Sequence, residues 1–168
     1  MLNNEKNWLN GFDWQRVVEI NRAVCQKEGV QSREGKGFEK ARSIWGSANA
    51  KAMSLVETLD LCRKASQLEP FEMLNNNTFA EVARGILEPH ISSASKFLKQ
   101  MLLSTAAHYV VGVAKRRELL QVIDYFDFAV GDGQFKPTTQ ENKNKDESKT
   151  EASRDSTRQS QTAGVSLR

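Results

Sequence analysis

The sequence has only two cysteines, Cys25 and Cys62, and no apolar run long enough to cross a membrane. A disulfide framework needs four or more cysteines at regular spacings, so this chain is not a disulfide-stapled scaffold. Its longest uncharged apolar stretch, residues 101–114, is shorter than the ~20 residues that a membrane-crossing helix needs. Residues 1–14 lack a basic region followed by an apolar run, which predicts that no secretory signal is present. We therefore expect a cytoplasmic protein without a membrane partner.

A strong charge of one sign is also missing. The 168 residues carry 24 basic and 21 acidic side chains, a net charge of +3, and the two signs are interspersed. A net charge this small creates no electrostatic field that would by itself select a polyanionic partner such as nucleic acid. With 39% hydrophobic and 27% charged residues, the chain suits one domain joined to a segment that stays in water.

The segment expected to stay in water is residues 137–168. It contains no aromatic residue, and its only apolar residues are Ala152, Ala163, Val165 and Leu167. So little apolar surface cannot offset the conformational entropy that folding would cost. The sequence therefore predicts an α-helical domain over residues 1–136, followed by a disordered polar tail over residues 137–168.

Cap residues and apolar spacing predict a first helix between Trp14 and Gly29. Asn10-Gly11 is a turn dipeptide, and Asp13 has a side chain suited to capping a helix N-terminus. Gly29 suits the left-handed position that commonly ends a helix. Apolar residues recur between these points at three- and four-residue intervals, which is the period of one helix face.

The clearest periodicity predicts one long helix over residues 38–62. Apolar residues follow one another there in steps of three and four: Phe38, Ala41, Trp45, Ala48, Ala52, Leu55, Leu59 and Cys62. Gly46 is the position at which we expect this helix to be kinked or interrupted. Glu69-Pro70 marks its end, because a residue before proline is pushed out of the helical region.

Two further helices are predicted around Pro89. Thr78 and Glu81 have the spacing of a capping box, which indicates a helix over about residues 79–87. After the break at Pro89, Ser92 or Ser93 can cap the next helix. Its inward stripe is predicted to include the following residues: Ala94, Phe97, Leu98, Met101, Leu102, Tyr109 and Val113.

A last helix completes the predicted fold. Gly112 and a basic triplet separate it from the preceding helix, and it runs to about Val130. The fold class is therefore all-α, a bundle of about five helices.

The start of the helix after Pro89 is the best candidate for a nucleic-acid contact. A helix-turn-helix presents the start of its second helix to the major groove, where short polar and basic side chains reach base edges. Side chains of this kind are found there: Ser92, Ser93, Ser95, Lys96, Lys99 and Gln100. The connection holds Pro89 and His90 where that motif has a glycine turn, and it is longer. The alternative interpretation is an ordinary helical corner.

The triplet Lys115, Arg116 and Arg117 has two interpretations. Basic side chains that neutralise phosphates release counterions, which supplies much of nonspecific nucleic-acid affinity. Basic residues near the end of a preceding helix also complement its dipole, and that role needs no ligand. No aromatic ladder for single-strand stacking accompanies the triplet, so both interpretations stay open.

No cofactor, metal or catalytic site is expected. Structural zinc sites use closely spaced ligand pairs, whereas Cys25, Cys62, His90 and His108 contain no such pair. The sequence also lacks a glycine-rich phosphate loop and a nucleophile elbow. We interpret His108, which lies in an uncharged stretch, as a hydrogen-bonded core residue. The chain is therefore predicted not to be an enzyme.

The last predicted helix offers a surface for protein contacts. Its sequence, RRELLQVIDYFDFAV, is apolar except for a narrow polar stripe. If Leu119, Val122, Ile123 and Phe126 pack inward, then Tyr125 and Phe128 project to the flank. The predicted protein interface consists of Tyr125, Phe128 and Val122. Neighbouring exposed aromatic rings are typical of interfaces. Alternatively, the N-terminal helix covers these rings.

The leading hypothesis is a non-enzymatic helical interaction protein that self-associates or docks on a partner protein through this last helix. The alternative is a DNA-binding regulator that uses residues 92–100. The two hypotheses place the functional side chains on different helices, so they predict different mutants: Tyr125 and Phe128 to Ser should dissolve an assembly, and Lys96 with Lys99 to Glu should abolish DNA retention.

Overall fold

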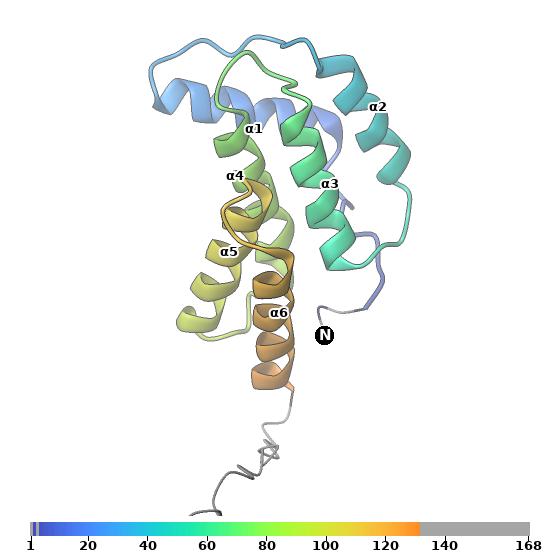
Figure 1. The fold of residues 1–168 in the computed structure, drawn as a ribbon, viewed down its shortest axis with the longest axis vertical. Helices are drawn as coiled ribbons and strands as arrows, with labels where there is room; N and C mark the ends of the chain where they lie inside the picture. The colour runs from blue at the N-terminus through green and yellow to red at the C-terminus, as the bar shows by residue number, and fades with distance from the viewer. Residues whose placement is uncertain (1, 3, 132–168) are drawn as a thin grey trace, which may run out of the picture. The chain divides into compact units, whose positions relative to one another are not determined.

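The computed structural model describes Leu2 and residues 4–131, and these residues are all-helical apart from loops and two isolated bridges (Figure 1). The elements along the chain are α1 (Trp14–Lys27), α2 (Phe38–Ala48), α3 (Leu55–Gln67), α4 (Asn75–Leu87), the 3-10 turn η1 (Glu88–His90), α5 (Lys96–Val110) and α6 (Arg116–Val130). The all-α prediction is confirmed, with six α-helices over the described residues in place of about five. The predicted tail, residues 137–168, lies outside the described residues.

Four helices, α3 to α6, run alternately in opposite directions, and α1 crosses them near one end (Figure 1). The helix α4 packs against α1, α3 and α5, while α6 packs chiefly against α5. Large side chains buried between these helices include Trp8, Trp45, Phe79, Leu59 and Leu102. The bundle therefore has one shared core, and α6 lies at its edge.

The first helix matches its prediction at both ends. The Asp13 carboxylate accepts a hydrogen bond from the Arg16 backbone N–H at 2.8 Å, which caps α1. Gly29 has φ +70°, the left-handed conformation that favours glycine, and its N–H donates to the Gln26 carbonyl.

The single long helix predicted over residues 38–62 is wrong, because the chain leaves the helix at Asn49 and re-enters it after Ser54. Ser54 and Glu57 form a capping box, which is a local signal for a new helix start. Met53 in the connection exchanges two backbone hydrogen bonds with Lys6, each 3.1 Å long. Gly46 lies within α2 and is not the point of interruption.

The predicted starts of the next two helices are also wrong. The helix α4 begins at Asn75, after Leu74 in the left-handed conformation at φ +59°, so Thr78 lies inside it and caps nothing. The Thr78 hydroxyl is buried, donates to the Leu74 carbonyl and accepts from the Asn21 side-chain amide at 2.9 Å. The helix α5 begins at Lys96, because Ser95 is the residue whose hydroxyl caps it.

The segment before α1 is fastened to the bundle through Trp8. The indole of Trp8 is almost fully buried, the Lys6 ammonium lies 3.7 Å from its ring centroid, and the His90 ring meets it edge-on at 4.8 Å. Partial burial lowers the pKa of His90 below 6.5, and the charge of Lys6 lowers it further.

This lowered pKa predicts a loss of stability on acidification. Unfolded chains bind a proton at His90 with a pKa near 6.5, above the pKa in the folded protein, so protonation favours unfolding. The contribution is present above pH 6.5 and is lost as the pH falls through the folded-state pKa. We expect the urea midpoint to fall between neutral and mildly acidic pH, and to fall less in His90→Gln. An equal fall in both proteins would contradict the assignment to His90.

Candidate interaction surface

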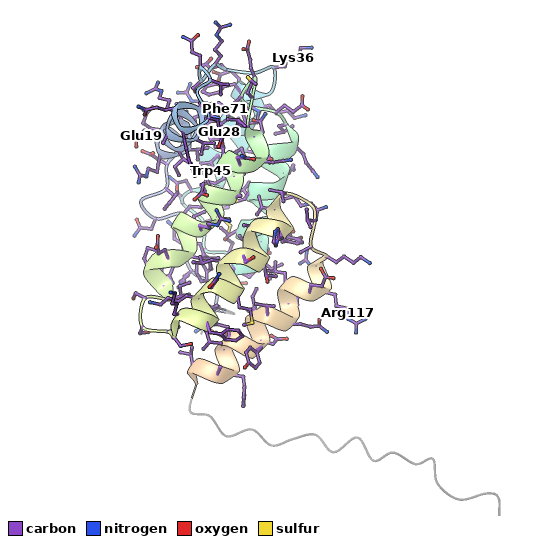
Figure 2. The ribbon with its side chains drawn as sticks, turned by 90° about the vertical axis from the view of Figure 1, so that its left-hand side faces the viewer. Glu19, Glu28, Lys36, Trp45, Phe71 and Arg117 are labelled. Carbon is purple, nitrogen blue, oxygen red and sulfur yellow. The ribbon has the colours of Figure 1, made fainter. Side chains whose placement is uncertain are left out.

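The helices α5 and α6 form an antiparallel hairpin. Gly112, at φ +85°, makes the turn after α5. The Lys115 backbone N–H then donates to the Glu118 carboxylate at 2.7 Å, which fixes the first turn of α6. The first turn of α5 and the last turn of α6 therefore lie at the same end of the hairpin (Figures 1 and 2).

One side of α6 packs inward as the periodicity predicted. Leu119, Ile123 and Phe126 are buried, and Val122 is partly buried and packs against the same core. Val122, predicted as part of an interface, therefore lies mainly on the inward side. The inward side follows steps of three and four residues, so the opposite side of the helix is left to solvent.

Hydrogen bonds hold α6 against the rest of the chain near both of its ends. At its start, the Arg116 guanidinium donates to the Asp60 carboxylate on α3 at 2.6 Å. Near its end, the Asp127 carboxylate accepts from the Leu2 backbone N–H, also at 2.6 Å. A helix held at two points presents its solvent side in one fixed orientation.

The solvent side of α6 carries an exposed surface of mixed chemistry. Tyr125 is 50% exposed, Leu120 39% and Phe128 37%, although all three are large apolar or aromatic residues. With 100° of rotation per residue, they share the outward side with three exposed polar residues. We call these six residues the α6 outer face: Arg117, Leu120, Gln121, Asp124, Tyr125 and Phe128.

The projection of Tyr125 and Phe128 agrees with the sequence-based expectation. The alternative, in which the N-terminal helix covers the rings, does not hold, because α1 packs against α4 and α2. Leu120 was not predicted as part of the surface. The sequence did indicate its position, because Leu120 lies three residues after Arg117 and four before Asp124, on the same side of the helix.

Two apolar residues that were predicted to face inward are exposed instead. Phe97 is 68% exposed and Val113 is 73% exposed. Phe97 lies in the first turn of α5, which starts later than predicted, and Val113 lies in the turn that follows Gly112. The predicted inward stripe of this helix therefore extended too far at both ends.

The candidate DNA-contacting residues lie in and after a long connection. Between Leu87 and Lys96 the chain passes through η1 and a loop, which is longer than the 3–4-residue turn of a helix-turn-helix. The exposed members of the candidate set are Ser92, Ser93, Ser95, Lys96 and Gln100. The Lys99 ammonium is half-buried and donates to the Ser92 carbonyl, so its charge is used within the chain.

The basic triplet does not join this set. Lys115 and Arg117 lie at the start of α6, next to the end of α5, whereas Lys96 lies at the other end of α5. A helix of 15 residues is about 22 Å long. Arg117 points away from the bundle (Figure 2), and Arg116 is bound to Asp60. The structure therefore does not gather the predicted basic residues on one surface.

Asp60 is the centre of a polar cluster between α3, α5 and α6. One carboxylate oxygen accepts a hydrogen bond from the Tyr109 hydroxyl, and the other accepts from Arg116. The Arg63 guanidinium lies 5.3 Å from the centroid of the Tyr109 ring. Burial raises the pKa of Tyr109, and the hydrogen bond and charge of Asp60 raise it further. Every charged group named here has a partner, so the cluster joins three helices.

A groove with a cavity volume of about 650 Å³ lies between α1 and α4. Its apolar part comes from Phe12, Ile20 and Val24, and its charged lining contains both signs equally: Arg16, Lys27, Arg84, Glu28, Glu81 and Glu88. Two of these charges, Arg84 and Glu81, pair with each other. A balanced lining of this kind selects no ligand charge.

The predicted absence of metal and membrane features remains an expectation about the whole chain. Within Leu2 and residues 4–131, no group of three potential ligands is placed to hold a metal ion, and no helix is long and apolar enough to cross a membrane. Cys25 and Cys62 are buried free thiols, and burial raises the pKa of Cys62 to about 12. His108 is exposed, so its assignment to the core was wrong.

No protein-family model, curated protein or solved structure matches this chain. Of the surfaces described, the α6 outer face combines exposed aromatic rings with a rigid support, and the groove and the Asp60 cluster lack such a combination.

Proposed function

We propose that this chain is a non-enzymatic helical interaction protein and that the α6 outer face is its contact surface. The observation that carries the proposal is the exposure of three large apolar or aromatic side chains, Leu120, Tyr125 and Phe128, on the solvent side of one helix, where polar residues lie between them. Exposed apolar and aromatic side chains gathered on one surface are typical of protein-contact sites, and tyrosine is enriched among the residues that dominate binding energy.

The support of α6 strengthens this proposal. Binding costs conformational entropy when a flexible segment must be ordered, and a surface that is already ordered avoids that cost. The contacts of Arg116 with Asp60 and of Asp127 with Leu2 order α6 before any partner arrives. The two free, buried cysteines are consistent with action in a reducing, cytoplasmic compartment.

Site-specific photo-crosslinking in native cells tests the proposal. A photoreactive amino acid in place of Tyr125 should form protein adducts, because that side chain lies in the contact surface. The matched control replaces Gln15, an exposed residue on α1, which should give no comparable adduct. Equal yields at the two positions, or no adduct at either, would contradict the proposal. Mass spectrometry of the adducts identifies what binds.

DNA binding through the start of α5 is the second candidate. It is supported by the exposure of Ser93, Lys96 and Gln100, and it is weakened by the long connection and by the internal hydrogen bond of Lys99. If this candidate were correct, Lys96→Glu together with Lys99→Glu would abolish retention on a DNA column. We expect the unmodified chain to elute from that column at low salt.

A further inference from the structure

We propose that the partner on the α6 outer face is a second copy of this chain, bound through a two-fold axis with the two α6 helices antiparallel. This inference rests on the proposed function of that face and names its partner. It follows from the spacing and the charges of the outer-face residues, which complement one another only in this orientation.

The spacing makes a seam along α6. Arg117, Gln121, Asp124 and Phe128 are separated by steps of four, three and four residues, which keeps them on one side of the helix for three turns. These are the steps of the alternating a and d positions of a heptad, with Gln121 and Phe128 at a positions and Arg117 and Asp124 at d positions. All four side chains are exposed.

In an antiparallel pair, a positions of one helix meet d positions of the other. With the axis crossing between residues 122 and 123, Arg117 meets Phe128 of the second copy, and Gln121 meets Asp124 of the second copy. A guanidinium on an aromatic ring and an amide N–H on a carboxylate are both favourable contacts. Two-fold symmetry makes each contact twice. A carboxylate accepts several hydrogen bonds, so Asp124 can keep its contact within the chain.

The flanking residues fit the same arrangement. Leu120 precedes an a position and lies on the same flank of the seam as Leu120 of the second copy, about 7.5 Å away along the helix direction. Tyr125 follows a d position and lies beside Glu118 of the second copy, where the phenol can donate to the carboxylate. The exposed apolar surface of Leu120, Tyr125 and Phe128 is then covered without a separate partner.

The parallel orientation is disfavoured by charge. It would place each a position against the same a position and each d position against the same d position, so Arg117 would face Arg117 and Asp124 would face Asp124. In addition, α6 has basic residues at its start and Asp124 and Asp127 in its second half, the reverse of what its own dipole favours. An antiparallel neighbour brings opposite charges to both ends.

The dimer is expected to be weak. Stable protein interfaces bury about 1,200–2,000 Å², and a pair of single helices buries less than that. The seam is also half polar, which lowers the gain from apolar burial. We therefore expect a dissociation constant on the order of 10 µM, so that monomer and dimer coexist at concentrations that can be reached in solution.

Substitution of Gln121 tests the orientation, because its expected effect changes sign with the new charge. In the antiparallel seam, Gln121→Lys faces Asp124 of the second copy and should tighten the dimer by about 3- to 10-fold. Gln121→Glu faces the same carboxylate and should weaken it by about the same factor. Sedimentation equilibrium of the full chain measures both dissociation constants. Matched Gln15→Lys and Gln15→Glu variants should leave them unchanged.

Each other outcome overturns the inference. In a parallel pair, residue 121 faces itself, so both substitutions would weaken the dimer. A chain that stays monomeric at all concentrations rules out the second copy as partner, and adducts of Tyr125 with a different protein would still support the proposed function. Equal effects at Gln121 and Gln15 would show that net charge, and not this seam, controls association. Circular dichroism confirms that each variant is folded.

Discussion

Gly37→Ala is expected to lose about 3 kcal/mol of unfolding free energy, at the upper end of the range for overpacking a close contact. A Cβ atom at residue 37 would lie 1.6 Å from the Leu68 carbonyl oxygen and 2.6 Å from its carbonyl carbon. These are backbone atoms, so no side-chain rotation relieves the contact, and the loop before α2 must move away from the end of α3. Urea denaturation followed by circular dichroism measures the loss.

Gly46→Ala is the matched control for this prediction. Gly46 lies in α2, and a Cβ atom there would have no neighbour within 4 Å. Alanine loses less conformational entropy than glycine in a helix, so this substitution should stabilise the chain by about 0.5–1 kcal/mol. The two glycines, nine residues apart, are thus expected to respond with opposite signs. A Gly37→Ala variant as stable as the Gly46→Ala variant would contradict the close packing of Gly37 against the end of α3.

Trp45→Ala is the second substitution with a large expected effect, a loss of about 3–5 kcal/mol. The Trp45 side chain is fully buried, and its ring centroid lies 6.1 Å from that of Trp14 and 6.2 Å from that of Phe79. Its removal therefore opens a cavity where α2 meets α1 and α4. The loss is measured from the urea midpoint of the variant, compared with that of the original chain when both show the same dependence of unfolding free energy on urea concentration.

Trp45→Phe separates the hydrogen bond of this side chain from its volume. The Trp45 indole N–H donates to the Phe12 carbonyl at 2.8 Å, which fixes the entry of the chain into α1. Phenylalanine keeps most of the buried ring and loses this bond, so the expected loss is about 1–2 kcal/mol. If Trp45→Phe and Trp45→Ala were equally unstable, cavity formation would not be the main cost.

Local signals predicted the helices well where a cap residue and a period agreed. Asp13 and Gly29 bounded α1 correctly, and Glu69-Pro70 correctly marked the end of α3. The break between α2 and α3 was missed because the apolar spacing continues across it through Ala52, which is exposed in the structure. The bridge between Lys6 and Met53, which holds the connection, joins distant residues and leaves no local pattern.

The sequence predicted part of the candidate surface, where the helical period is clear, and missed the part that depends on cap choice and tertiary contacts. The inward side of α6 follows one uninterrupted period, so the exposure of Tyr125 could be inferred from Leu119, Ile123 and Phe126. Phe97 was misplaced because three serines, Ser92, Ser93 and Ser95, compete as caps, and spacing alone does not choose among them. The bonds that fasten α6 to Asp60 and Leu2 are tertiary contacts, which the sequence does not reveal.

The most direct measurement is the molar mass of the full chain by light scattering over a range of concentrations, alongside the Tyr125→Ser, Phe128→Ser double variant. We expect the mass to rise with concentration from 18.9 kDa towards twice that value, and the double variant to stay at 18.9 kDa while keeping its helical circular dichroism. A mass of 18.9 kDa at every concentration would contradict self-association, as would a double variant that associates like the original chain.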